Sequence, residues 1–224
     1  MNSFSEGRVL LIDKPLHWTS FDVVRKVRNI VKVKKVGHAG TLDPLATGLL
    51  IICTGKFTKN INEYMAREKE YTGSITLGAT TPTYDLESEP ENFLPVDQIT
   101  EDQVYAATKP FIGEIMQVPP AHSAIKVDGK RVYELARQGR EVKLEPRKLT
   151  IQTFEITSVE MPKVFFRVVC STGTYIRSLA NDFGKELGCG GYLSSLRRTR
   201  IGEFSVDDAM TMEAFRSSVA EQIS

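Results

Sequence analysis

Apolar and polar residues follow two different periods along this chain of 224 residues. Short apolar runs at residues 8–13 and 49–53 predict buried strands, because each lies between turn-forming residues. Alternation over residues 70–77, 148–159 and 164–171 predicts strands with one buried face, the last two paired with each other. Long alternating strands favour an antiparallel arrangement. We therefore predict an α/β (α+β) fold with a mixed, mostly antiparallel central sheet flanked by helices.

Between these strands, apolar residues at helical spacing predict helices. Thr19 and Asp22 resemble a capping box at a helix start, and Val24, Val27 and Val31 then repeat on one face. The basic residues of this segment occupy the other face, which is predicted to lie toward the loop that follows. Further helices are predicted over residues 57–65, 102–108, 172–188 and 212–219, and another is predicted after Lys130, ending at Gly139.

Charge is nearly balanced overall but unevenly distributed. Lys and Arg total 29 against 28 Asp and Glu, a net charge of +1. Residues 23–42 carry six basic residues and no acid, and residues 122–148 carry eight basic residues and four acids. Arg197, Arg198 and Arg200 form a third cluster, whereas acids gather in residues 85–102, a predicted surface connection. This separation fits a polyanion-binding face, while a single cluster would fit an ordinary solvated helix face.

Several classes of protein receive little support. The cysteines Cys53, Cys170 and Cys189 form no CxxC motif, and their odd number with no signal peptide predicts reduced thiols and a cytoplasmic location. No apolar run approaches the length of a membrane span. The three histidines are scattered, so a metal site is not indicated.

The sequence GHAGTLDPLATG, residues 37–48, contains a single carboxylate, Asp43, among three glycines. Asp43 is the only acid between Asp22 and Glu63. A lone carboxylate in a shaped, cationic loop suits a nucleophile, a base or a ligand. An ordinary Asp-Pro turn between two elements is an equally good interpretation of the spacing alone.

Two tyrosines and an arginine extend the candidate chemistry. Tyr71 is predicted on one face of a strand, and Tyr175 precedes Arg177 at a helix start. An arginine near Asp43 would keep the carboxylate ionised, an ionised carboxylate can be a covalent nucleophile, and a tyrosine face can stack a nucleobase. A core position explains Tyr71 equally well. Arg177 near a first helical turn opposes the helix dipole, which favours a specific partner for it.

The stretch around Asp43 resembles the nucleophile motif GTLDPLATG of the TruB family of tRNA pseudouridine synthases. Other segments match that family in the same order, so the resemblance runs from about Arg8 to Gly202. These segments are Asp13-Lys14-Pro15 with Thr19-Ser20, Lys69-Glu70-Tyr71 with Leu77-Gly78, Gln117-Val118-Pro119-Pro120 with Ser123-Ala124 and Lys126, Cys170 to Arg177, Leu187 to Gly190, and Leu196-Arg197-Arg198.

The resemblance implies isomerisation of the T-loop uridine at position 55 of tRNA to pseudouridine, with no cofactor or metal. Asp43 would be the nucleophile, attacking either C1′ of the ribose or the base ring. Tyr71 would stack on the flipped uracil and Arg177 would pair with Asp43. Tyr175 and Leu196 would line the uridine pocket.

The remaining roles implied by the resemblance concern RNA binding. His38 would hold the T-loop fold, and Lys14 and Lys126 would contact the substrate. The basic insertion at about residues 119–146 would clamp the T arm like a thumb. The chain ends at Ser224 where many bacterial members continue, so we expect one catalytic domain over residues 1–224, no complete C-terminal PUA domain, and a monomer that needs no protein partner.

Some positions depart from the family pattern, and two rival functions stay open. His17 replaces a usual Gly, Pro82 replaces a common Asp, and His122 replaces a usual Tyr. One rival is a catalytically silent RNA-binding protein, which would not need Asp43, Tyr71 and Arg177 together. The other is a synthase of the guide-RNA branch, which the short chain disfavours.

Overall fold

The computed structural model describes residues 3–121, 126–127, 130–131 and 144–221. The chain divides into two compact units: residues 1–72 with 196–224, called unit 1, and residues 73–195, called unit 2. Strands β4 (Lys69–Leu77) and β10 (Gly191–Ile201) contribute residues to both units. The predicted mixed α/β fold with a central mixed sheet is confirmed.

Unit 1 is built around the apolar strand β3 (Ala46–Thr54). It pairs antiparallel with β1 (Val9–Lys14) and β2 (Val36–Ala39), and parallel with β10. Side chains alternate along β3, so Leu50 and Ile52 enter one core cluster while Leu49, Ile51 and Cys53 enter another. Burial on both faces explains why the predicted strand is a continuous apolar run.

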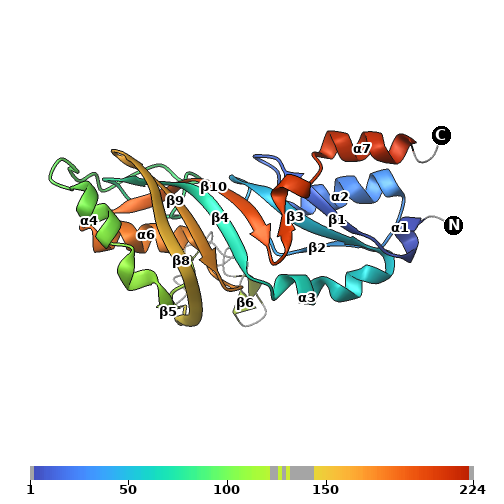
Figure 1. The fold of residues 1–224 in the computed structure, drawn as a ribbon, viewed down its shortest axis with the longest axis horizontal. Coiled ribbons are helices and arrows are strands. Elements are labelled where there is room, and N and C mark those ends of the chain that lie inside the picture. The colour runs from blue at the N-terminus through green and yellow to red at the C-terminus, as the bar shows by residue number, and fades with distance from the viewer. Residues whose placement is uncertain (1–2, 122–125, 128–129, 132–143, 222–224) are drawn as a thin grey trace. The chain divides into compact units, whose positions relative to one another are not determined.

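Helix α2 (Ser20–Val31) covers one face of this sheet. The predicted capping box is present, with the Thr19 hydroxyl accepting from the Asp22 amide and the Asp22 carboxylate accepting from the Thr19 amide. Val24, Val27 and Val31 are buried beside the strand residues, each contributing about 1.5–3 kcal/mol by burial. The remaining elements of unit 1 are α1 (Ser3–Glu6), η1 (Gly55–Asn60), α3 (Ile61–Met65), β11 (Phe204–Ser205), η3 (Val206–Asp208) and α7 (Met212–Glu221), which packs beside α2 (Figure 1).

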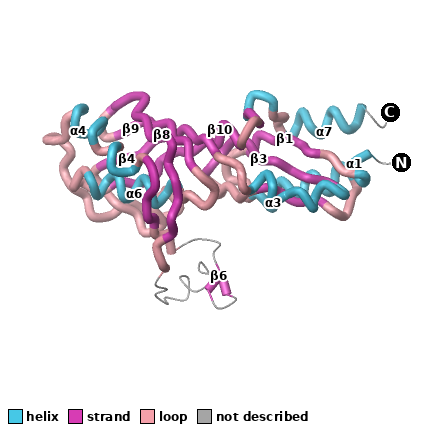
Figure 2. The backbone as a smooth tube through the Cα atoms, turned by 60° about the horizontal axis from the view of Figure 1, so that its bottom comes forward, coloured by secondary structure: helices cyan, strands magenta, loops and turns pink. Residues whose placement is uncertain are grey.

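In unit 2 the hydrogen-bonded strands follow β10, β4, β9 (Lys163–Cys170), β8 (Arg147–Glu160) and β5 (Gly113–Gln117). Figure 2 shows β8 and β9 as long neighbouring strands, the antiparallel pair that alternation predicted. Helix α6 (Ile176–Glu186) buries Phe183, whose ring lies 5.4 Å from that of Phe154 on β8. The other elements are α4 (Glu101–Ala106), η2 (Lys109–Phe111), β6 (Lys126–Val127) and β7 (Lys130–Arg131).

Several local predictions differ from the structure. The helix expected over residues 57–65 is present as a 3-10 helix followed by α3, and the helix expected from residue 172 is present but begins at Ile176. Asp85 was assigned to a surface connection but is 3% exposed. Strands β2 and β10 were not predicted as strands. The helix expected after Lys130 lies outside the described residues.

No helix of the described residues is long and apolar enough to cross a membrane. The same residues contain no group of His, Cys, Asp and Glu side chains arranged to hold a metal ion. Cys53, Cys170 and Cys189 are all buried, and none of the three forms a disulfide.

Candidate active site

Asp43 lies in the connection between β2 and β3 and is partly buried. On one side, the buried Ser20 hydroxyl accepts from the Leu42 amide at 2.9 Å and donates to the Leu42 carbonyl at 3.2 Å. On the other side, the Pro44 carbonyl accepts from the His17 amide at 2.8 Å. The Asp43 carbonyl closes a turn by accepting from the Ala46 amide at 3.0 Å. Asp43 is therefore a turn residue and also a carboxylate whose backbone is fixed on both sides.

His17 has a left-handed backbone, with φ +66°. The family pattern has Gly at this position, and Gly adopts positive φ at no steric cost. His tolerates this region better than most residues. His17 thus adopts a conformation that is also open to Gly, and in it the His17 amide donates to the Pro44 carbonyl.

Two buried cations lie beside the Asp43 loop. Lys14 is fully buried and donates from Nζ to the carbonyls of Pro15 at 3.0 Å and Trp18 at 2.6 Å. Arg198 is 1% exposed and donates to backbone carbonyls of the loop and of β3. Burial lowers the pKa of Lys14 to about 8, and the Asp43 carboxylate acts in the opposite direction.

His38 lies on β2, opposite Ile52 of β3. Burial, followed by the positive charge of Arg198, lowers its pKa, while an interaction with the Gly40 backbone acts the other way. A histidine that is neutral near neutral pH suits hydrogen bonding to RNA better than ion pairing with phosphate. The predicted role of His38 in RNA handling stays a prediction.

Arg177 begins the buried face of α6 in unit 2 and is 5% exposed. Its Nε lies 3.7 Å from Oδ2 of Asp85, and its Nη1 donates to the Thr83 carbonyl at 3.3 Å. The specific partner that the helix dipole argument predicted for Arg177 therefore includes Asp85, which the sequence analysis missed. The predicted pairing of Arg177 with Asp43 stays a prediction.

The other predicted pocket residues lie on both units. Tyr71 is 8% exposed on β4, within unit 1. Leu196 on β10 pairs with Ala46, directly after the Asp43 turn. Tyr175 caps α6 in unit 2, where the buried Gln117 side chain accepts from its amide at 2.9 Å and donates to its carbonyl at 3.1 Å. The side chain of Lys126 lies outside what the structure describes, although its backbone pairs with Arg131.

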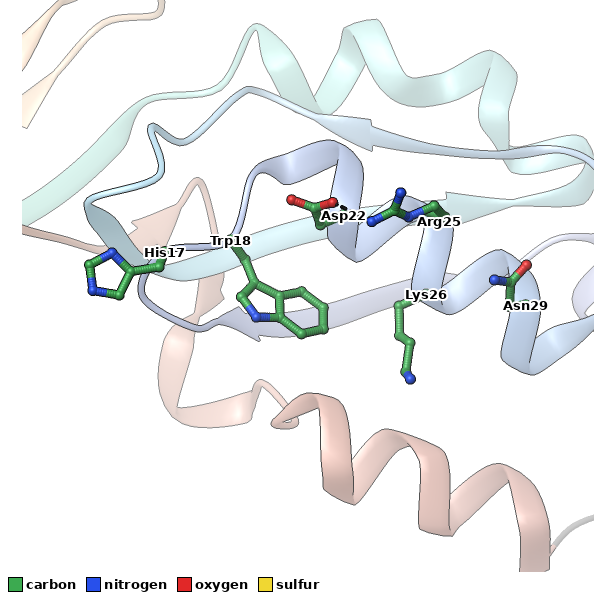
Figure 3. A pocket seen from close by; sticks show the side chains of 6 residues that line it. All are labelled: His17, Trp18, Asp22, Arg25, Lys26 and Asn29. Carbon is green, nitrogen blue, oxygen red and sulfur yellow. Dashed lines mark hydrogen bonds and ion pairs between the residues drawn. The ribbon is translucent and has the colours of Figure 1, made fainter. Parts of the chain in front are cut away.

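A separate hollow of about 400 Å³ opens on unit 1 along α2 and the loop before it (Figure 3). Neither Asp43 nor Tyr71 lines it. Its lining includes two cations of α2, Arg25 and Lys26, and Arg25 pairs with Asp22 at 2.7 Å. The lining residues are His17, Trp18, Asp22, Arg25, Lys26 and Asn29.

Comparison with known proteins identifies the family of this chain. Residues 28–176 match the model described as the N-terminal domain of TruB family pseudouridylate synthases. Residues 177–223 match the C-terminal domain model of tRNA pseudouridylate synthase B. The chain belongs to the TruB family. Membership makes it an isomerase of the pseudouridine synthase class.

Relatives of this TruB family member cover almost its entire length. A protein of Flavobacterium johnsoniae named tRNA pseudouridine synthase B is 53% identical over 223 residues, which are 96% of this chain and 97% of the relative. A protein of the same name from Phocaeicola vulgatus is 50% identical over 226 residues, 98% of this chain and 96% of the relative.

Two solved structures are similar to this chain in fold and in sequence. One of a Cbf5-Nop10-Gar1 complex has a TM-score of 0.73 and 32% identity, covering 96% of this chain and 54% of that one. Another, of an H/ACA RNP bound to a substrate RNA containing 2′-deoxyuridine, has a TM-score of 0.71 and 29% identity, covering 96% and 53%. The chain thus spans about half the length of these matched structures.

The structure of this TruB family member also changes the interpretation of the third basic cluster. That cluster was predicted as part of a polyanion-binding face, but Arg198 is buried. Arg197 donates to both carboxylate oxygens of Asp13, at 3.0 and 2.8 Å, and Arg200 pairs with Glu68 at 2.9 Å. The three arginines therefore form hydrogen bonds and ion pairs mainly within the protein.

Proposed function

We propose that this chain converts the T-loop uridine at position 55 of tRNA into pseudouridine, with Asp43 as the nucleophile. The observation that carries the proposal is the fixed backbone of Asp43 next to two buried cations, Lys14 and Arg198. A positive environment favours the ionised carboxylate, which is the nucleophilic form. Family membership supports the reaction class, and relatives about 50% identical carry the tRNA name.

The proposed chemistry is redox-neutral. The Asp43 carboxylate attacks either C1′ or the base ring, and the bond between N1 of uracil and C1′ breaks. The uracil rotates and C5 bonds to C1′. The bond between Asp43 and the substrate breaks, which regenerates the carboxylate, while C5 loses its proton and N1 gains one. Tyr71 would stack on the uracil and Leu196 and Tyr175 would line its pocket, as the family resemblance implies.

Positive charge on unit 1 supports tRNA as the substrate. A base inside the T loop must be extruded before the nucleophile reaches it, which costs a few kcal/mol. Phosphate contacts can offset that cost. Arg25 and Lys26 along the α2 hollow, and Lys126, Lys130 and Arg131 in the predicted clamp, are the basic residues that we assign to such contacts.

The deciding experiment is incubation of the protein with unmodified tRNA in the absence of added cofactor, followed by mapping of pseudouridine by position. We expect modification at the T-loop uridine with the wild-type chain. We expect Asp43→Asn to bind the T arm and to form no product, because the amide is not a nucleophile. Product formation by that variant would disprove the role of Asp43, and modification at another position would disprove the site.

Salt dependence tests the clamp separately. Charge removal at Lys126, Lys130 and Arg131 should weaken tRNA binding and flatten the plot of log affinity against log salt. The slope should fall by somewhat under about one unit for each phosphate that is no longer neutralised. Lys163→Ala on β9 serves as the control, because that exposed lysine is outside the proposed contacts. An unchanged slope in the triple variant would reject the clamp.

The guide-RNA alternative is less well supported. Two solved structures of H/ACA particles are 28% and 29% identical to this chain, whereas the relatives named tRNA pseudouridine synthase B are about 50% identical over nearly the full chain. We therefore propose free tRNA as the substrate, a monomer as the active form and the cytoplasm as the site of action.

A further inference from the structure

Arg198 connects the two ends of the Asp43 loop. Its Nε donates to the Leu49 carbonyl at 2.8 Å, its Nη2 to the Gly40 carbonyl at 3.1 Å and its Nη1 to the Thr41 carbonyl at 3.5 Å. Gly40 and Thr41 precede Asp43, and Leu49 follows it in β3. One planar guanidinium therefore fixes the chain on both sides of the carboxylate.

This arrangement is costly as a purely structural device. Removing a charged group from water costs several kcal/mol, and an apolar side chain of similar volume at such a position is often neutral or stabilising. The ion pairs among the described residues do not include Arg198. Among the described residues its donors bond to backbone carbonyls of the loop and of β3, so its hydrogen bonds are directed at the Asp43 loop.

The strand register places Arg198 in one row with Lys14. Gly48 of β3 pairs with Lys14 of β1 on one side and with Arg198 of β10 on the other. The charge of Arg198 lowers the pKa of both Lys14 and His38, and Asp43 raises that of Lys14. These groups therefore share one electrostatic environment in which Asp43 is the carboxylate.

Two other carboxylates near this row, Asp22 and Asp13, are already paired. Asp22 acts weakly on Lys14 and is occupied by Arg25 and the helix cap. Asp13 of β1 pairs with Arg197 at 2.8 Å.

We propose that Arg198 is a positioning residue for the isomerisation, which holds both ends of the Asp43 loop and supplies a permanent positive charge to the cluster of Lys14 and Asp43. The proposal rests on the proposed function of Asp43. An arginine suits this task better than a second lysine, because it stays charged and presents its donors in a rigid fork.

The test compares Arg198→Met with Arg198→Lys. Both variants lose the set of guanidinium hydrogen bonds to the carbonyls of Gly40, Thr41 and Leu49, but the lysine keeps the positive charge. With saturating tRNA in single-turnover reactions, we expect both to be slower by about 10²-fold, because misplacement of a reacting group by about 1 Å costs that much. The tRNA dissociation constant should be unchanged. Arg167→Met on β9, which removes an arginine paired with Glu155 at 3.5 Å, should keep the wild-type rate.

The pH profile separates positioning from general structural support. Loss of the permanent charge favours the neutral form of Asp43, so the acid limb of the rate should move to higher pH in Arg198→Met. Arg198→Lys should keep the wild-type acid limb. A wild-type rate in the methionine variant, an equal shift in both variants, or a loss of tRNA affinity as large as the loss of rate would each overturn the proposal.

Amide hydrogen exchange tests, independently of catalysis, whether Arg198 holds the Asp43 loop. Amides of residues 40–48 should exchange faster in both Arg198 variants than in the wild type, while those of α6 should not change. If the wild-type chain formed no pseudouridine, the proposed function would be wrong, but hydrogen exchange would still show whether Arg198 holds the Asp43 loop. If Arg198→Met did not fold, Arg198→Lys would provide the rate and the exchange, and wild-type values for both would overturn the proposal.

Discussion

Lys14 is a fully buried lysine, and replacing it with methionine should change how stability depends on pH. The methionine side chain has similar length and carries no proton to exchange. It loses the hydrogen bonds to the carbonyls of Pro15 and Trp18, but that loss does not vary with pH. The difference between wild type and Lys14→Met therefore isolates the titration of one ammonium group.

The magnitude follows from the shift of this group. Burial lowers the pKa of Lys14 from 10.5 to about 8 in the folded chain. Between these values the unfolded chain binds more protons than the folded chain, so the free energy of unfolding rises with pH across this window. Each unit above the folded pKa adds about 1.4 kcal/mol, so wild type should gain about 1.4 kcal/mol over the variant between about pH 7 and about pH 9.

Urea unfolding of both proteins at these two pH values measures the difference directly. All other titrating groups cancel in the comparison, provided that both proteins unfold in two states. Lys56→Met on η1 is the matched control, because it makes the same substitution at an exposed lysine. Equal pH dependence in wild type and Lys14→Met would refute the assignment of a depressed pKa to Lys14.

Four further changes test individual features of the site. Gly48→Ala should destabilise the chain by about 2–4 kcal/mol in urea unfolding, because φ is +102° and a Cβ would overlap the backbone of β10; wild-type stability would contradict this. His17→Gly should stabilise it by about 1 kcal/mol through relief of the left-handed backbone, so a loss of stability would contradict the strain. Tyr71→Phe should bind tRNA as tightly as wild type and lose turnover, whereas full turnover would exclude a chemical role for the hydroxyl. Asp85→Ala should cost about 1–3 kcal/mol in urea unfolding, because it removes one anionic partner of the buried Arg177 guanidinium, and wild-type stability would contradict this contribution.

Local patterns in the sequence were sufficient to predict many of the helices and strands in both units. The capping box at Thr19 and Asp22 and the alternation in β8 and β9 depend on neighbouring residues or on a period of two, so they are visible along the chain. The motif around Asp43 identified the loop and, through the family resemblance, the reaction. Strand β2 has only four residues and contains Gly37 and His38, so its pattern was too short to predict.

The sequence by itself determined the fold class, the Asp43 loop and the family of this protein, because these depend on short-range order and on a motif of contiguous residues. Only the tertiary structure decided what the charged residues do. Arg198 binds the Gly40 carbonyl across 158 positions, and Arg177 binds the Thr83 carbonyl across 94. The sequence shows each of these residues only as one cation among others, whereas burial forces each to find specific partners. The physical reason is that these side chains lose their contact with water only when strands distant in the sequence pair. A cation buried in this way must bond to specific groups of the protein.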